Sequence, residues 1–199
     1  MTKTLLLVAP IPFEGARVSC QSRIFETKGI TSRKVRQEKL CAFALLEKGF
    51  SLMGLEVNSL SPYKDDRGKW HFDGIEASIT HTDGLCCAAI SPVAVGVDAE
   101  RLDRSIPRGL MKKICTTGER AALEAVSDAE RPSAAVSLWT QKEAVFKANG
   151  TLPFSKIDTE KEKLCQFGAR TGGRDYIISL YPVSDIEIIT NGVEIWPLT

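Results

Sequence analysis

The sequence lacks any marked excess of charge: 26 Lys and Arg residues face 25 Asp and Glu residues, and the formal net charge is +1. Broad binding to nucleic acid or to a membrane surface needs a strong basic excess, so this balance favours neither partner. Long hydrophobic runs are missing too. The apolar stretch before Pro10 is too short for a signal peptide or a membrane span, and we interpret it as a buried strand.

Several site motifs are also absent. None of the six cysteines lies in a C-x-x-C pair, and two histidines are too few to complete a zinc site. We therefore expect reduced, buried thiols in a cytoplasmic protein. There is no Walker phosphate loop and no G-x-G-x-x-G motif. The contents of 43% hydrophobic and 26% charged residues are typical of a globular protein.

Helix and strand signals occur in both halves of the chain. The first predicted helix begins after the N-cap Ser32 and ends at Gly54, and a second covers 106–115. A third begins at the capping box of Thr116 and Glu119. A fourth begins near Ser133 and ends at Asn149 and Gly150. Strands are predicted over 74–80, 84–91, 92–100 and within 174–196, where Asn191-Gly192 is a hairpin turn signal. Each half thus has a long helix and several strands, as expected of an α+β protein, and the halves divide near 101–106.

Two carboxylates end a predicted strand in the segment GVDAE (96–100). Asp98 and Glu100 are two positions apart, and alternate strand side chains share a face, so both project from one side. They could be solvated acids where the strand meets a loop, or ligands in a site.

A second group of charged residues lies on the predicted helix in WTQKEAVFKANG (139–150). Trp139, Glu143 and Lys147 are four residues apart and form one stripe. Glu143 and Lys147 could be a surface ion pair, which contributes only ~0.3–0.5 kcal/mol. Trp139 favours the other interpretation, because an aromatic side chain turns the stripe toward the core.

Together these elements predict a magnesium site. Three neighbouring carboxylates repel one another unless a cation neutralises them. All-oxygen ligation suits magnesium, which is commonly shared with substrate phosphates. A lysine one turn away could hold such a phosphate, so the pattern indicates metal-assisted phosphoryl chemistry.

The two segments, about forty residues apart, resemble the paired signatures of the 4′-phosphopantetheinyl transferases, G-[IV]-D-x-E and W-[TS]-x-K-E-A-x-x-K-x-x-G. Further, GKWHFDGIEASITHT is similar to the family's G-K-P…S-H-S segment, with Trp70 in place of proline and Thr80 and Thr82 in place of the serines. SRKVRQEKLCAFALL resembles the family's basic N-terminal helix. The chain length is similar to that of the monomeric two-lobed type.

This resemblance implies an α+β pseudo-dimer of two similar lobes, each a long helix packed on a small, mostly antiparallel sheet. We expect lobes of residues 1–103 and 104–199, packed as one unit with the active site between them. The implied enzyme moves the 4′-phosphopantetheine of coenzyme A to a serine of an apo carrier protein (acyl, peptidyl or aryl) in fatty acid, polyketide or nonribosomal peptide biosynthesis. This is holo-acyl-carrier-protein synthase chemistry, and it releases adenosine 3′,5′-bisphosphate.

The resemblance also implies roles for individual residues. The expected Mg²⁺ ligands are Asp98, Glu100 and Glu143, and the expected catalytic residues are Glu143 and Lys147. Coenzyme A would be bound by Lys69, His81, Lys142 and one or more of Arg33, Lys34 and Arg36. Two alternatives remain: a non-catalytic homologue that binds coenzyme A or a carrier protein, and a magnesium-dependent pyrophosphate hydrolase.

Overall fold

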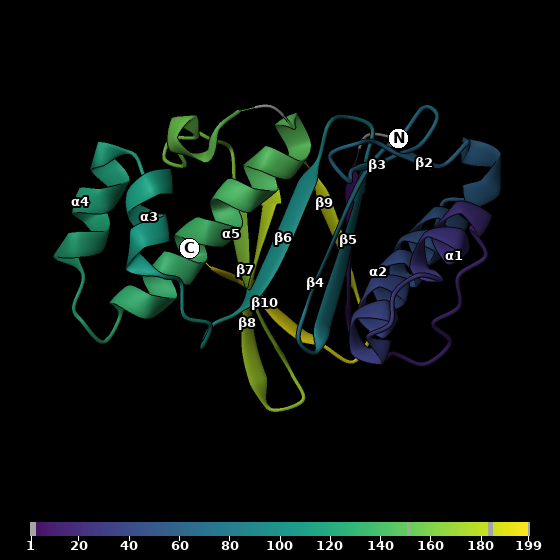
Figure 1. Ribbon diagram of the computed structural model, residues 1–199, viewed down its shortest axis with the longest axis horizontal. Coiled ribbons are helices and arrows are strands. Elements are labelled where there is room, and N and C mark those ends of the chain that lie inside the picture. The colour runs from purple at the N-terminus through teal and green to yellow at the C-terminus, as the bar shows by residue number, and fades with distance from the viewer. Residues whose placement is uncertain (1–2, 151, 183–184, 199) are drawn as a thin grey trace.

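The computed structural model describes residues 3–150, 152–182 and 185–198, which form two four-stranded sheets flanked by helices (Figure 1). The helices are α1 (Gln21–Thr27), α2 (Arg33–Leu52), α3 (Arg108–Ile114), α4 (Thr117–Ala125) and α5 (Arg131–Asn149), with 3-10 turns at Val57–Leu60 and Phe154–Lys156. The strands are β1 (Thr4–Pro10), β2 (Tyr63–Lys64), β3 (Trp70–His71), β4 (Glu76–Thr82), β5 (Leu85–Ser91), β6 (Gly96–Arg101), β7 (Cys165–Thr171), β8 (Arg174–Tyr181), β9 (Ile186–Thr190) and β10 (Glu194–Leu198). The α+β class is confirmed.

The strands pair in an order that does not follow the chain. The first sheet runs β4-β5-β1-β9 and the second runs β10-β7-β8-β6, while β2 and β3 form a separate small pair. Neighbours are antiparallel except β1 and β9, which are parallel. Antiparallel pairing therefore dominates both sheets.

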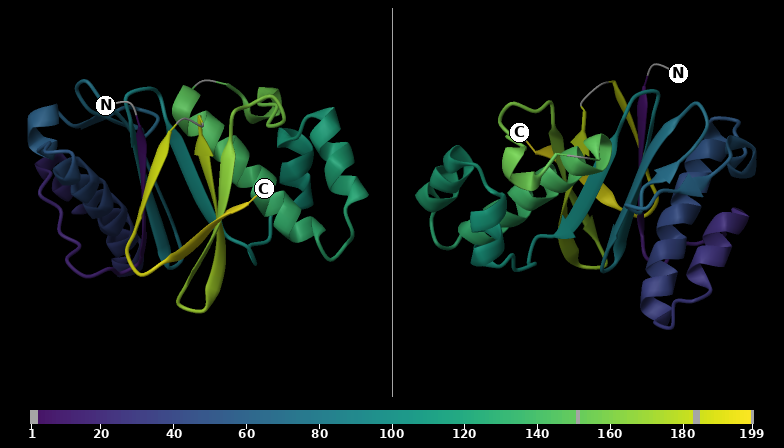
Figure 2. Two further views of the ribbon diagram at one scale, coloured as in Figure 1. Left: turned by 180° about the vertical axis from the view of Figure 1, so that it is seen from behind. Right: turned by 45° about the horizontal axis from the view of Figure 1, so that its top comes forward.

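The two sheets form inner layers between the two groups of helices (Figures 1 and 2). Alternate residues of the first sheet separate cleanly: Leu5 and Leu7 pack on the α2 side, whereas Leu6 and Val8 pack in the core shared with the second sheet. This period-two alternation is what a strand buried on both faces requires. A third core cluster joins α3 and α5 to the second sheet.

Strands are exchanged between the two halves of the sequence. β6 precedes the expected boundary at 103/104, yet it pairs with β8 of the second sheet; β9 follows the boundary, yet it pairs with β1. The predicted hairpin at Asn191-Gly192 is therefore wrong. The turn is present, but β9 and β10 leave it for different sheets.

The local helix signals agree well with the structure. The Ser32 hydroxyl accepts a hydrogen bond from the backbone N–H of Val35, and Thr116 with Glu119 forms a capping box. Helix α5 begins at Arg131, two residues before the predicted start, and ends at Gly150, whose φ of 74° is left-handed. Within the described ranges, no helix has the length and apolar character needed to cross a membrane.

Candidate active site

The three carboxylates predicted as metal ligands line one pocket. Asp98 and Glu100 come from β6, Glu143 comes from α5, and the pocket of 350 Å³ also contains Lys147 and Arg104. The two strand carboxylates share the face of β6 that is turned toward α5, because the intervening Ala99 is buried in the core between the sheets. The structure thus brings together the residues that the two sequence segments predicted.

Threonines from β4 orient both strand carboxylates. The hydroxyl of Thr80 donates to Asp98 Oδ1 over 2.9 Å, and the hydroxyl of Thr82 donates to Glu100 Oε2 over 3.1 Å. Lys147 donates to Asp98 Oδ1 over 2.7 Å, so it forms its ion pair across the helix–strand interface and not with Glu143. The surface-pair interpretation of Glu143 and Lys147 is therefore wrong.

Glu143 lies in an environment that favours its neutral form. Burial, and next the nearby Asp98 carboxylate, raise the pKa of Glu143, and the cations Lys147 and Arg104 only partly oppose this. Trp139, one turn earlier, stacks on Phe154 with 5.7 Å between ring centroids, which turns the stripe toward the protein interior as predicted. A partly buried carboxyl of raised pKa is suited to accept a proton near neutral pH.

The carboxylate pocket has the donor chemistry that magnesium prefers. In the described part of the chain, Asp98 Oδ2 is buried without a hydrogen-bond partner, and Glu143 forms no hydrogen bond. An orphaned buried carboxylate oxygen is costly unless it meets a donor or a cation. However, no three His, Cys, Asp or Glu side chains among the described residues are grouped closely enough to hold a metal, and Lys147 and Arg104 pair with Asp98 and Glu100 instead.

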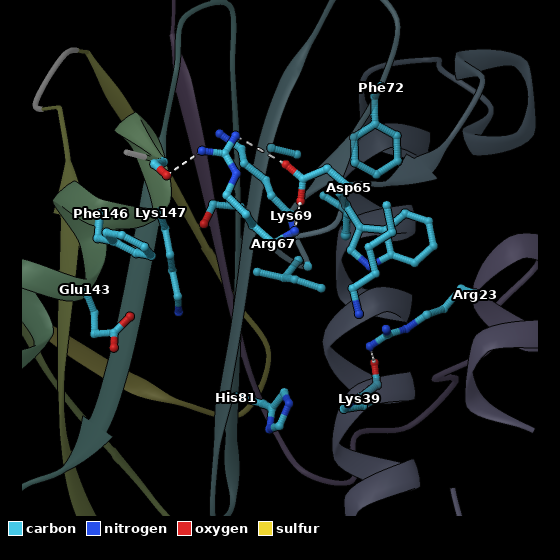
Figure 3. A pocket seen from close by; sticks show the side chains of 18 residues that line it. Arg23, Lys39, Asp65, Arg67, Lys69, Phe72, His81, Glu143, Phe146 and Lys147 are labelled. Atoms are coloured by element: carbon cyan, nitrogen blue, oxygen red, sulfur yellow. Dashed lines mark hydrogen bonds and ion pairs between the residues drawn. The ribbon is translucent and has the colours of Figure 1, made fainter. Parts of the chain in front are cut away.

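A second cavity, of 360 Å³, adjoins the carboxylate pocket (Figure 3). The two pockets share Ile79, His81, Glu143 and Lys147. Helix α5 forms one side of this cavity, and α1 and α2 approach the other side in Figure 3. Besides Lys147, its lining includes five cationic residues: Arg23, Lys39, Lys64, Arg67 and Lys69. A protein with a net charge of only +1 therefore concentrates positive charge at this place.

The turn before β3 joins the cavity to the end of α5. Arg67 donates to the carbonyl of Gly150, and Lys69 donates to the carbonyl of Ala148 over 3.3 Å. Cations at the C-terminal end of a helix complement its dipole. Asp65 holds the turn by accepting from the backbone N–H of Lys69 over 2.8 Å, so the position of Lys69 is fixed although Trp70 follows it.

His81 lies where the two pockets meet, and it is uncharged at neutral pH. Burial, followed by the positive charge of Lys147, lowers the pKa of His81 to about 4. A neutral imidazole can donate one hydrogen bond to a phosphate oxygen without adding charge. His81 thus lines both pockets, and its contact with a ligand stays a prediction.

Four of the predicted coenzyme A residues do not reach the cavity. Lys142 is fully buried and donates to Glu119 and to the carbonyls of Phe154 and Ile157. Arg33, Lys34 and Arg36 are exposed in the first turn of α2 and line neither pocket, and Lys34 pairs with Asp83 over 2.7 Å. The basic helix does reach the cavity, but through Lys39.

Arg23 is the cavity residue that sequence reasoning missed most completely. It is only 3% exposed, and its guanidinium lies over the rings of Phe43 and Trp70 while donating to the carbonyl of Lys39. Nothing in the local sequence marks it, because α1 is short and has no side-chain cap. By contrast, Lys64, Arg67 and Lys69 are clustered in one turn-rich segment, and this clustering could have indicated a cationic site from the sequence alone.

A carboxylate pocket joined to a cation-rich cavity is the arrangement of a protein that handles a phosphorylated substrate. Residues 94–178 match the family model of the 4′-phosphopantetheinyl transferase superfamily. The matched segment holds β6, α5 and all three carboxylates, and it is similar to that superfamily of transferases. No curated protein matches the chain in a sequence comparison.

Proposed function

We propose that the protein transfers the 4′-phosphopantetheine group of coenzyme A to a serine of an apo carrier protein and releases adenosine 3′,5′-bisphosphate. The observation that carries this proposal is the junction of the two pockets at His81, Glu143 and Lys147. A pyrophosphate placed there would have carboxylates on one side and a cationic cavity on the other. We expect a cytoplasmic monomer that acts in fatty acid, polyketide or nonribosomal peptide biosynthesis.

The cationic cavity would bind the anionic end of coenzyme A. The substrate's pyrophosphate and 3′-phosphate need several donors, and Arg23, Lys39, Lys64, Arg67 and Lys69 provide them. In this proposal Arg23 and Lys39 take the role expected of Arg33, Lys34 and Arg36, because only the former pair lines the cavity. Lys142 has no part in binding.

Asp98, Glu100 and Glu143 would hold Mg²⁺ once Lys147 and Arg104 give way to it. Bound there, the ion would neutralise the charge of the pyrophosphate oxygens. Thr80 and Thr82 fix the directions of Asp98 and Glu100, so two of the three ligands are already oriented.

The protein's own groups would move the proton and support the leaving group. Glu143 accepts the proton of the serine hydroxyl as the oxygen attacks the phosphorus that bears the pantetheine arm. The bond from that phosphorus to the bridging oxygen of the pyrophosphate breaks, and the electron pair leaves with adenosine 3′,5′-bisphosphate. Lys147, one turn along α5, neutralises the charge that develops on this leaving phosphate.

The test is an incubation with coenzyme A, Mg²⁺ and an apo carrier protein, followed by mass spectrometry of the carrier. We expect the added mass of phosphopantetheine, and we expect Glu143→Gln to lower the rate about 10²–10⁴-fold because it removes the proton acceptor. Glu160→Gln is the matched control, since Glu160 is exposed and lies in neither pocket. No modification of any carrier, or bisphosphate release without a carrier, would overturn the proposal; the latter would indicate a hydrolase.

A further inference from the structure

The three carboxylates of the candidate site differ in how many of their oxygens are free. Asp98 Oδ1 accepts hydrogen bonds from Thr80 and Lys147, whereas Asp98 Oδ2 is buried without a partner. Glu143 forms neither a hydrogen bond nor an ion pair with any residue that the structure describes. Glu100 is the exception among the three, because both of its oxygens are engaged.

The two oxygens of Glu100 have different partners. Thr82 on β4 donates to Oε2 over 3.1 Å, and the guanidinium of Arg104 pairs with Oε1. A hydroxyl can stay bonded to a carboxylate that also binds a cation, whereas two positive charges at the same carboxylate repel each other. Arg104 therefore controls whether Glu100 can join Asp98 and Glu143 around a divalent cation.

The backbone of Arg104 is fixed, but its side chain is held weakly. Its backbone N–H donates to the carbonyl of Arg101 over 3.1 Å, and Ile106, two residues further on, is buried. The side chain is 43% exposed, and Glu100 is its only ion-pair partner in the described part of the chain. Ion pairs at such exposed positions contribute ~0–1 kcal/mol, so a competing anion can take the guanidinium away.

Of the two cations in the pocket, Arg104 is the more weakly held. Lys147 is 28% exposed and has two acceptors, Asp98 Oδ1 at 2.7 Å and a backbone carbonyl of β6 at 3.2 Å. The guanidinium of Arg104 lies over the ring of Trp139, 5.7 Å from its centroid, and Trp139 lines the same pocket. A guanidinium on a ring face keeps its N–H donors for a phosphate, which it can bind with two parallel hydrogen bonds. The ring thus keeps Arg104 at the pocket when it leaves Glu100.

We propose that Arg104 is a resident counter-cation of the carboxylate pocket, which leaves Glu100 for a phosphate oxygen of the substrate and so makes the binding of a divalent cation and of coenzyme A mutually dependent. The inference rests on the proposed function, which requires both ligands in this pocket. Without a phosphate, a cation that binds Glu100 displaces Arg104 into solvent. With a pyrophosphate present, Arg104 gains an anionic partner and the carboxylate is released, so each ligand favours the other by the same factor.

The test measures the affinity of the protein for Mn²⁺, with and without coenzyme A and with no carrier protein present. Mn²⁺ prefers the same oxygen ligands as Mg²⁺, and its free concentration is read from its electron paramagnetic resonance signal, with coenzyme A alone as the blank. For the wild type we expect coenzyme A to lower the Kd for Mn²⁺ about tenfold. Arg104→Gln should bind Mn²⁺ alone about threefold more tightly than the wild type, and the effect of coenzyme A on that Kd should shrink by the same factor.

Arg101→Gln is the matched control for this substitution. Arg101 directly follows Glu100 and its loss changes the net charge by the same amount, but it pairs with Asp83 and Asp103 and lines neither pocket of the site. Its Kd values for Mn²⁺ should equal those of the wild type. Arg104→Lys keeps a positive charge beside Glu100, so its Kd for Mn²⁺ without coenzyme A should stay close to that of the wild type.

The sign of the change separates this inference from a purely structural role. If Arg104 only oriented Glu100, Arg104→Gln would bind Mn²⁺ more weakly than the wild type, and that result, or Kd values equal to those of the control, would overturn the inference. A wild type that binds no Mn²⁺, or whose affinity does not rise with coenzyme A, would do the same. Transfer to a carrier protein, measured separately, leaves the proposed function standing in each of these cases. Coupled binding without transfer would overturn the proposed function and support the role of Arg104.

Discussion

Lys142 and Glu143 are adjacent in the sequence, yet their side chains lie in different environments. Successive helix residues are rotated by about 100°, so Glu143 faces the carboxylate pocket while Lys142 enters the interior beside Glu119. The Lys142 ammonium uses its donors on Glu119, Phe154 and Ile157. Lys142 therefore holds α5 in position and leaves ligand binding to the neighbouring stripe.

Replacing Lys142 tests this positioning role. Lys142→Met leaves the Glu119 carboxylate buried without its cation, which we expect to lower the free energy of unfolding by about 3–5 kcal/mol. Adding Glu119→Gln removes the unpaired charge and should restore part of that loss. Denaturant unfolding measures both effects. The affinity for coenzyme A, measured by calorimetry on the folded variant, should not change. If the variant lost this affinity but kept its stability, Lys142 would have a direct part in coenzyme A binding.

His81 should respond to pH differently from an exposed histidine. Its pKa is lowered to about 4 from 6.5, mainly by burial, so the unfolded chain takes up the proton more readily than the folded protein. The contribution of His81 to stability is therefore complete above about pH 6.5 and is lost as pH falls toward 4. NMR titration of the ligand-free protein should show a histidine signal with a midpoint near 4 that His81→Gln removes. A midpoint near 6.5 would contradict the burial seen here.

At the scale of elements, the sequence predicted the pieces better than their pairing. The capping box at Thr116 and the helix end at Gly150 are local signals, and both are confirmed. The hairpin at Asn191-Gly192 was wrong because a turn signal does not specify the strands that its flanks join, which depends on distant partners. For the same reason the sequence located the carboxylates, whose signatures are local, but missed Arg23, which long-range packing brings to the cavity.

Strand β6 packs tightly against α5 at Gly96. A side chain at Gly96 would place its Cβ 1.9 Å from the carbonyl oxygen of Ala144, so only glycine fits. Because this contact sets the distance from Asp98 to Glu143, Gly96→Ala should lower the free energy of unfolding by about 3 kcal/mol and reduce transfer activity in the remaining folded protein.

Gly118→Ala in α4 is the control for this substitution. No atom lies within 4 Å of the added Cβ at Gly118, so alanine should be neutral or should stabilise the helix by up to about 1 kcal/mol. Thermal unfolding of the two variants compares them directly. Equal stability of Gly96→Ala and wild type would show that α5 can move away from β6 without cost.

At the scale of the whole molecule, the exchanged strands make the two sheets interdependent. Strand β9 pairs with β1 in the first sheet, although in the sequence it comes after three of the four strands of the second sheet. The core between the sheets contains residues of both, such as Leu6, Cys87, Ala99 and Ile178. Neither sheet can therefore unfold without exposing apolar surface of the other. The site depends on this union, because its carboxylates and cations come from both sides of the shared core.

We therefore expect a single cooperative unfolding transition. Trp70 is buried on the α2 side of the first sheet, and Trp196 lies on β10 at the edge of the second. The third tryptophan, Trp139, lies on α5, so variants that lack Trp139 and keep only Trp70 or only Trp196 report on each side separately. Their fluorescence in increasing urea should give the same midpoint and the same dependence on denaturant as far-UV circular dichroism. A first transition seen by Trp196 alone would mean that the second sheet can unfold by itself, and that the shared core and strand β9 do not couple the two sheets. With a single transition, a substitution that weakens either sheet should also lower the stability of the candidate site.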